Sequence, residues 1–447
     1  MFPPGPSQKV SPNIVFPYFF SGVLALVASS VFLFFSSRDL IGGNFLDPKI
    51  LALVHLAALG WITSVMTGAF HQMAPVLLNA PLFSQSLSRV SLPVYLCGWI
   101  GMVSAFATSE YRILPIFASL AAFGLLLLVL NLLGTVVRAS NLTLIGFYIL
   151  SAILHLTLAL GIGVLLAFQL VHPFLPVDQL TLLRAHVYAA FAGWIGMTVM
   201  GVSLRLIPMF SLSHGFSTRP GWIALILTNV GLIGTVVSQF AGYGGVASLC
   251  TIVLIAGLVS YLVQVLLIIR SRVRKLPDPA LTGSLISYLY WMPLIVCMIL
   301  HHTGLVTFSW NAGRGGIAFF FFLFFGPVSS LIISQLLKIV PFLVWLHHYG
   351  PMAGRLPTPL PRDLLKETWV TAQLALYHTS VGIGVSGILL GSERVLQAAG
   401  LGLLASSLIL LFLCASAYSH MYIENERKGG DHEQGGSAPT PVICSGS

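Results

Sequence analysis

Charged residues are scarce in this chain. Asp, Glu, Lys and Arg make up 7% of its 447 residues, whereas hydrophobic residues make up 57%. A soluble domain contains roughly 25% charged residues, so this composition excludes a water-soluble globular protein. The apolar segments reach the ~20 residues needed to cross a bilayer, and they lack the alternating pattern of membrane β-barrels. The sequence therefore predicts an all-α, polytopic membrane protein.

Motifs of soluble catalytic sites are also missing. The chain has no P-loop, no H-E-x-x-H and no C-x-x-C, which argues against nucleotide, zincin-type and thiol-redox chemistry. Four of its five cysteines fall in predicted spans, and the fifth, Cys444, lies in the polar tail. This pattern predicts inert thiols rather than a disulfide framework. Without C-x-x-C-H, any haem would be bound noncovalently.

The apolar segments predict twelve spans in a single membrane domain over residues 13–422. A cytoplasmic N-terminal segment, 1–12, precedes it and a disordered cytoplasmic tail, 423–447, follows it. Thirteen of the 21 Lys and Arg residues flank spans on the side that holds both termini, and six lie on the other side. Because basic residues mark the cytoplasmic face, we expect both termini in the cytoplasm and the chain in the inner (cytoplasmic) membrane. The net charge of +9 is thus a topology signal, and we expect the lipid bilayer and no nucleic acid as a partner.

A repeat runs through the chain. Segments 60–75, 193–208 and 326–341 each run from a glycine to a proline at the same distance, and the three glycines are equally spaced along the chain. The pattern predicts three pseudo-symmetric four-helix units, at about 13–136, 145–270 and 283–422, related by an axis along the membrane normal. Small residues recur at Gly60, Ser64 and Gly68, and such rows allow close approach of a neighbouring helix or of a flat macrocycle. The shared polar positions Gln72, Arg205 and Lys338 are expected to snorkel to the headgroups.

Two local motifs carry a family resemblance. They are "VHLAALGW" at 54–61 and "RAHVYAAFAGW" at 184–194. With the twelve-helix, three-unit plan, they resemble subunit I of the haem-copper oxidases, which include cbb3-type oxidases and nitric oxide reductases. The resemblance implies b-type haem and copper, with His55 as a haem ligand and His186 as a copper ligand. It also implies a respiratory or nitrogen-oxide-related electron-transfer role, with a redox partner subunit or cytochrome.

The sequence departs from the family where the remaining ligands belong. Phe321 occupies the place equivalent to His55, and the predicted seventh span has no histidine. We therefore expect an incomplete binuclear site, with the second haem ligand supplied by His301 or His302 or with five-coordinate iron. His55 lies five residues before its glycine and His186 seven before its own. That difference is about 200° on a helix, so we expect the two side chains to face different interhelical spaces and not to share a ligand.

The other intramembrane histidines have weaker assignments. His71, near the predicted cytoplasmic boundary, is expected to cap or snorkel and to bind no haem. His155 and His378 fit a structural role and a ligand role equally well. Three function classes remain: a redox subunit, which if it is an enzyme would be a respiratory oxidoreductase; a transporter or channel for a metal ion or small solute; and a haem-free assembly or sensor protein.

Overall fold

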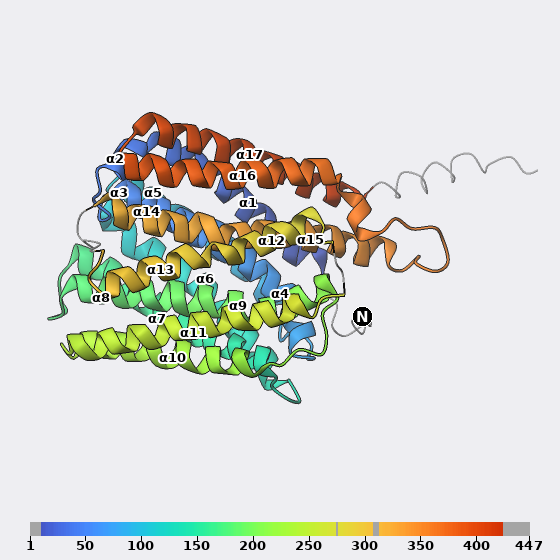
Figure 1. The fold of residues 1–447 in the computed structure, drawn as a ribbon, viewed down its shortest axis with the longest axis horizontal. Helices are drawn as coiled ribbons and strands as arrows, with labels where there is room; N and C mark the ends of the chain where they lie inside the picture. Colours follow the sequence, from blue (N-terminus) through green and yellow to red (C-terminus); the bar gives the residue numbers. More distant parts are fainter. Residues whose placement is uncertain (1–9, 274–275, 307–312, 423–447) are drawn as a thin grey trace, which may run out of the picture.

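A computed structural model describes residues 10–273, 276–306 and 313–422. It contains twelve helices long and apolar enough to cross a membrane, and no β-strand among these residues. Figure 1 shows the helices as one bundle with roughly parallel axes. The predicted all-α, twelve-span membrane protein is confirmed. Residues 1–9 and the predicted tail 423–447 lie outside the described residues.

Each third of the chain contributes four spans. The first contains α1 (Pro12–Phe35), the continuous α3 (Pro48–His55), η2 (Leu56–Thr63) and α4 (Ser64–Leu77), then α5 (Gln85–Ala107) and α6 (Leu114–Val137). The second contains α7 (Leu144–Val171), the continuous α8 (Gln179–Val187), η4 (Tyr188–Gly196) and α9 (Met197–Ser211), then α10 (Arg219–Phe240) and α11 (Gly244–Arg270). The third contains α12 (Pro279–Leu289) with α13 (Trp291–His302), the continuous α14 (Arg314–Leu323), η5 (Phe324–Val328), α15 (Ser329–Val344) and η6 (Trp345–Tyr349), then α16 (Glu367–Leu390) and α17 (Glu393–Ser419). The predicted unit boundaries, at about 13–136, 145–270 and 283–422, stay a prediction.

The three units pack in the same way. The last two spans of each unit pair along their length: α5 with α6, α10 with α11, and α16 with α17. The first span packs on the second: α1 on η2 and α4, α7 on η4 and α9, and α12 on α15. In Figure 1 the pair α16 and α17 forms the upper edge of the bundle, and α10 and α11 form the lower edge. The second span of each unit therefore lies toward the interior.

Aspartates begin the two inner spans that carry His55 and His186. Asp47 accepts a hydrogen bond from the Lys49 amide at the start of α3, and Asp178 accepts one from the Thr181 amide at the start of α8. Such N-caps satisfy amides that have no partner inside the helix. Hydrogen bonds from Thr181 also hold the pKa of the Asp178 carboxyl below its usual range. Asp178 therefore stays charged at neutral pH, and it lies beside the N-terminus of α8, which is the positive end of the helix dipole.

A wide π-helical turn interrupts each inner span at the repeated glycine. Gly60 lies in η2, Gly193 in η4 and Gly326 in η5. Single π turns inside α-helices are rare, and many occur at functional sites. Their recurrence at three equally spaced positions is structural evidence for the pseudo-threefold repeat.

Hydrogen bonds between the inner spans follow the same symmetry. The Trp61 indole N–H donates to Ser329 Oγ at 2.9 Å, and the Trp194 indole N–H donates to Thr63 Oγ1 at 3.1 Å. In both bonds the donor is the residue that follows the repeated glycine of one unit. The acceptor is the third residue after the repeated glycine of another unit. The third unit has Pro327 at the donor position, which has no indole N–H. Two of the three possible bonds around the axis are therefore formed.

The repeated small residues serve helix packing. A Cβ atom at Gly60 would stand 2.9 Å from Ala25 Cβ of α1, and one at Gly201 would stand 2.6 Å from Tyr148 Cβ of α7. The neighbouring helix of the same unit fills this space. The close-packing interpretation of the row is therefore correct, and the macrocycle interpretation at Gly60 is wrong.

One of the three shared polar positions, Gln72, does not snorkel. Gln72 is buried, and Lys338 forms an ion pair with Asp278, the N-cap of α12. Asp278 directly precedes the span that begins at Pro279, so the ion pair of Lys338 lies at the end of that span. Arg205 is exposed, as snorkelling requires.

Candidate functional site

His55 is held in one orientation at the end of α3. Its Nδ1 lies 2.8 Å from the carbonyl oxygen of Leu51, one turn earlier. Because a carbonyl only accepts hydrogen bonds, Nδ1 carries the proton and Nε2 carries the lone pair. The Phe106 ring stacks on the imidazole with ring centres 5.0 Å apart. In the described part of the chain, Nε2 of His55 makes no hydrogen bond.

His186 is held in the same manner from a neighbouring helix. Its Nδ1 lies 3.0 Å from the carbonyl oxygen of Ala159 on α7, which again leaves the lone pair on Nε2. Gly163 makes room for the ring, because a Cβ atom there would stand 2.9 Å from His186 Cε1. Metal-bound histidines typically donate their second ring N–H to a carbonyl or carboxylate. Both imidazoles thus have the tautomer and the fixed orientation of a metal ligand.

The two imidazoles lie side by side. Their ring centres are 6.5 Å apart and their planes differ by 24°. An ion bonded to two imidazole nitrogens at ~2 Å would hold the ring centres roughly 5 to 6.5 Å apart. The expectation that His55 and His186 face different interhelical spaces is therefore wrong. Figure 1 places α3 and α8, which carry them, at the same end of the bundle.

The register between the inner spans explains this correction. Trp194 stands one residue after its repeated glycine and contacts Thr63, which stands three residues after its own. His186 stands seven residues before its glycine and His55 five before its own, so the same offset of two residues applies. Spans related by rotation about an axis meet through different faces. A difference of two residues therefore brings these side chains together instead of separating them.

His301 and His302 end α13, and both are half-buried. Nδ1 of His301 lies 3.3 Å from the carbonyl oxygen of Val306, at the edge of the segment outside the described residues. The proposed pairing of His55 with either of them stays a prediction. The imidazole that the structure brings to His55 is that of His186.

His71 is fully buried, so the expectation that it caps or snorkels is wrong. It lies in the interior of α4, with its ring 5.2 Å from that of Tyr18. Within the described chain, neither of its ring nitrogens has a hydrogen-bond partner. Its polar side chain is enclosed by α1 and α4, which pack tightly here because Gly68 is small.

His155 and His378 have side-chain partners of their own. Nε2 of His155 lies 2.9 Å from Asn229 Oδ1, and Nδ1 of His378 lies 2.8 Å from the Tyr290 hydroxyl. The Cβ of His155 also packs directly on Gly193. These contacts link spans within one unit, which favours a structural role for both histidines.

The residues present do not fit a copper ion held by three imidazoles. No group of three or more His, Cys, Asp or Glu among the described residues is placed to hold a metal ion. Phe321, at the place equivalent to His55, packs against Gly384 of α16. Among the residues that the structure describes, His186 therefore has one imidazole neighbour, His55, and not the set that the family resemblance implies for copper.

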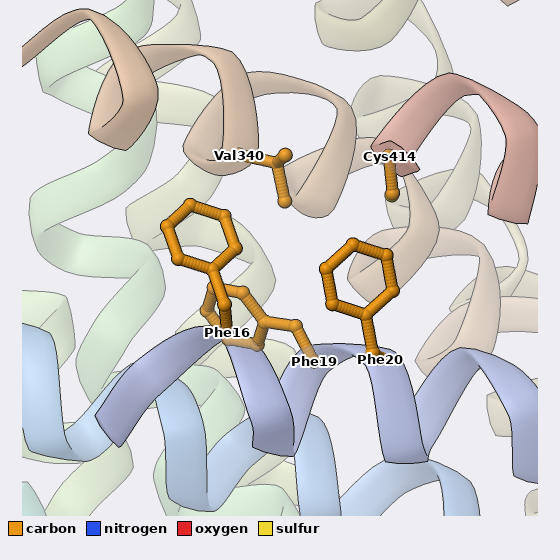
Figure 2. Close-up of a pocket in the computed structure, with 5 residues that line it drawn as sticks. All are labelled: Phe16, Phe19, Phe20, Val340 and Cys414. Atoms are coloured by element: carbon orange, nitrogen blue, oxygen red, sulfur yellow. The ribbon is translucent and has the colours of Figure 1, made fainter. Parts of the chain in front are cut away.

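An apolar crevice elsewhere in the bundle offers no chemistry. Figure 2 shows Phe16, Phe19 and Phe20 of α1 facing Val340 of α15 and Cys414 of α17. All five side chains are apolar or weakly polar, and Cys414 is a buried thiol. The crevice is a packing contact between α1, α15 and α17.

Comparison with known proteins identifies the fold. No family model and no curated protein matches the sequence. A solved structure described as a heme-copper terminal oxidase dimer matches with a TM-score of 0.65, over 92% of this chain and 85% of that one. The chain has a haem-copper oxidase subunit I-like fold. At 13% identity, the similarity to that oxidase establishes the haem-copper oxidase-like fold alone, and the chemistry depends on the histidines described above.

Sequence patterns did not reveal the residues that hold the two imidazoles. Ala159 contributes a backbone carbonyl, Gly163 contributes space and Phe106 contributes a ring face, and none belongs to the repeat or to the two motifs. The "GW" of the first two units was visible as a match. Its role as the donor of hydrogen bonds between units required the structure.

Proposed function

We propose that this protein is a membrane-embedded electron-transfer subunit that binds b-type haem through His55 and His186. The observation that carries the proposal is the pair of neighbouring imidazoles, each with Nδ1 bonded to a carbonyl and with the lone pair on Nε2. When bound, the haem would supply a reversible one-electron couple. Binding through two imidazoles would suit such a role, since His55 and His186 together would leave no place on the iron for a substrate.

The chain's own residues would orient the ligands and shield the site. The carbonyls of Leu51 and Ala159 fix both rings and raise their basicity. Phe106 covers one face of His55. Because the described residues do not form a three-imidazole copper set, the proposal is electron transfer and not dioxygen reduction at a binuclear centre.

The number of spans and the distribution of basic residues also bear on location and partners. An even number of spans places the start of α1 and the end of α17 at the same end of the bundle. Most basic residues flank this end, so we propose that it faces the cytoplasm. His55 and His186 would then lie near the outer face. An electron donor or acceptor, either a partner subunit or a soluble cytochrome, would dock there.

Haem content and the reduced-minus-oxidised optical spectrum of the purified full chain test this function. We expect a b-type band in the unmutated protein produced with ample haem. His55→Ala and His186→Ala should each lose most of that band, because each removes one of two ligands. His172→Ala is the matched control, since His172 is an exposed histidine of the loop between α7 and α8, and it should keep the full band.

Two outcomes would count against the proposal. The absence of any band in haem-replete, folded protein would favour the haem-free assembly or sensor function. Loss of the band in His301→Ala or His302→Ala, with His186→Ala unaffected, would instead support the pairing expected from the sequence alone.

A further inference from the structure

Charge is distributed unevenly between the two ends of the first two units. At the end where α1 begins and α17 ends, every Asp, Glu, Lys or Arg of residues 10–273, apart from none, is an arginine: Arg89, Arg138, Arg205, Arg219, Arg270 and Arg272. The opposite end carries acidic and basic residues in equal number: Asp39, Asp47, Glu110, Asp178, Arg38, Lys49, Arg112 and Arg184. Lys49 and Asp39 pair there at 3.1 Å. The first of these ends therefore presents positive charge that no carboxylate in this part of the chain compensates.

Two of these arginines lie together at one end of the α10–α11 pair. Arg219 is the first residue of α10, and Arg270 is the last residue of α11. The buried side chain of Gln264 in α11 accepts a hydrogen bond from the Gly221 amide and donates one to the Ser217 carbonyl. These bonds fix the start of α10 against α11, so the positions of Arg219 and Arg270 are set by the fold.

Arg272 joins them from the turn after α11. Its backbone pairs with that of Ser213, in the loop before α10. Arg219 and Arg270 are exposed, and Arg272 is half-buried. Within the described chain, none of the three side chains forms an ion pair. We call Arg219, Arg270 and Arg272 the arginine corner.

Helix stability does not explain the arginine corner. Arg219 stands at the N-terminus of α10, which is the positive end of the helix dipole and disfavours a cation. Guanidinium groups that share one corner also repel one another. An anion bound by them would offset both costs. Phosphate suits the corner, because its oxygens accept parallel hydrogen bonds from one guanidinium.

Exposed apolar side chains continue from the corner along the surface of the span pair. Trp222 and Ile223 of α10 and Leu266 of α11 are exposed, and the Trp222 ring centre lies 5.4 Å from that of Phe147 on α7. Tryptophan is enriched at the headgroup level of membrane proteins. A free phosphate ion would leave this apolar surface uncovered, whereas a phospholipid joins a phosphate to acyl chains that cover it.

We propose that the arginine corner binds the headgroup phosphate of an anionic phospholipid, with the acyl chains along α10 and α11. Clusters of basic residues that border membrane helices recognise anionic lipids in this way. An anionic headgroup gains more from the corner than phosphatidylcholine does, because the choline cation is repelled by the guanidinium groups. The corner lies at the opposite end of the bundle from His55, and the inference holds whether or not the protein binds haem.

Native mass spectrometry of the full chain tests the proposal. The protein is released from mixed micelles that contain equal amounts of phosphatidylglycerol and phosphatidylcholine, and the lipid that stays bound is counted. We expect the unmutated protein to retain phosphatidylglycerol in about fivefold preference. The triple variant Arg219→Gln, Arg270→Gln and Arg272→Gln should lower this ratio to near unity. Arg270→Gln alone should lower it in part, and this variant replaces the triple variant if the latter does not fold.

A second triple variant, Arg89→Gln with Arg138→Gln and Arg355→Gln, is the matched control. It removes the same charge from exposed arginines at the same end of the bundle, but outside the arginine corner. It should keep most of the preference for phosphatidylglycerol. Equal losses in the two triple variants would show that diffuse positive charge attracts the lipid, and would overturn the proposal. The absence of any preference in the unmutated protein would overturn it as well.

Discussion

The first two units of this protein differ from the third at corresponding positions of the same fold. The inner spans of units one and two carry a histidine near the same end of the bundle, and a tryptophan follows each repeated glycine. In the third unit Phe321 stands in place of a histidine and Pro327 in place of a tryptophan. All three units nevertheless form the same π turn and the same pairing of their last two spans. The comparison shows that the fold depends on small residues and apolar packing, whereas the candidate chemistry resides in two units.

Substitution of the repeated glycines by alanine should give the largest difference in stability between the units. A Cβ at Gly193 would collide with the Cβ of His155, which is fixed to the backbone of α7. At Gly326 the nearest atom is a ring carbon of Phe322 at 2.9 Å, and that side chain can move. Because overpacking costs roughly 1–3 kcal/mol, Gly193→Ala should lower the free energy of unfolding by about 3 kcal/mol, and Gly326→Ala by clearly less.

Denaturant titration of the purified protein in mixed micelles measures both variants. Gly382→Ala is the control, because a Cβ there meets no atom within 4 Å, and it should not destabilise the protein. Equal losses at Gly193 and Gly326 would show that the tight contact in the second unit is not what distinguishes them.

The bonds between inner spans should have the next largest effect. Thr63→Val keeps the side-chain volume but removes the acceptor of the buried Trp194 indole N–H. An unpaired buried donor costs ~1–3 kcal/mol, so we expect a loss of about 2 kcal/mol in the same titration. The double variant Thr63→Val with Trp194→Phe should lose less than the sum of the single variants. Strict additivity would indicate that the bond does not stabilise the fold.

Substitution of tyrosines on the third span of a unit should give the smallest difference in stability between units. The Tyr95 hydroxyl donates to the Leu59 carbonyl, and the Tyr377 hydroxyl donates to the Phe325 carbonyl. The Leu59 carbonyl also accepts a hydrogen bond from the Ser64 hydroxyl. In the described chain, the Phe325 carbonyl accepts a side-chain hydrogen bond from Tyr377 alone. Tyr377→Phe should therefore cost about 1 kcal/mol and Tyr95→Phe less. The reverse order of unfolding free energies would contradict this account of the π turns.

Composition and spacing were sufficient to predict the twelve spans and the repeat. Apolar length determines a membrane span, and the equally spaced glycines mark the positions of closest packing. The relation between His55 and His186 could not be predicted in this way. It depends on the register between two spans from different units, and the sequence of either span taken alone does not determine that register.

The local sequence was also insufficient to predict the surroundings of some polar side chains. Lys338 pairs with Asp278, which directly precedes a different span, α12, and the sequence around Lys338 does not predict this partner. Hydropathy predicts His71 at the membrane boundary, but α4 continues past it inside the bundle. In both cases contacts with other spans determine the surroundings of the side chain, and hydropathy alone does not report them.

Low-temperature EPR of the oxidised, haem-replete protein tests most directly whether His55 and His186 share one iron. The account predicts a low-spin ferric signal typical of two imidazole ligands in the unmutated protein. That signal should disappear or become high-spin in His55→Ala and in His186→Ala, and it should persist in His301→Ala and His302→Ala. A high-spin signal in the unmutated protein, or a low-spin signal that survives His186→Ala, would contradict the central claim.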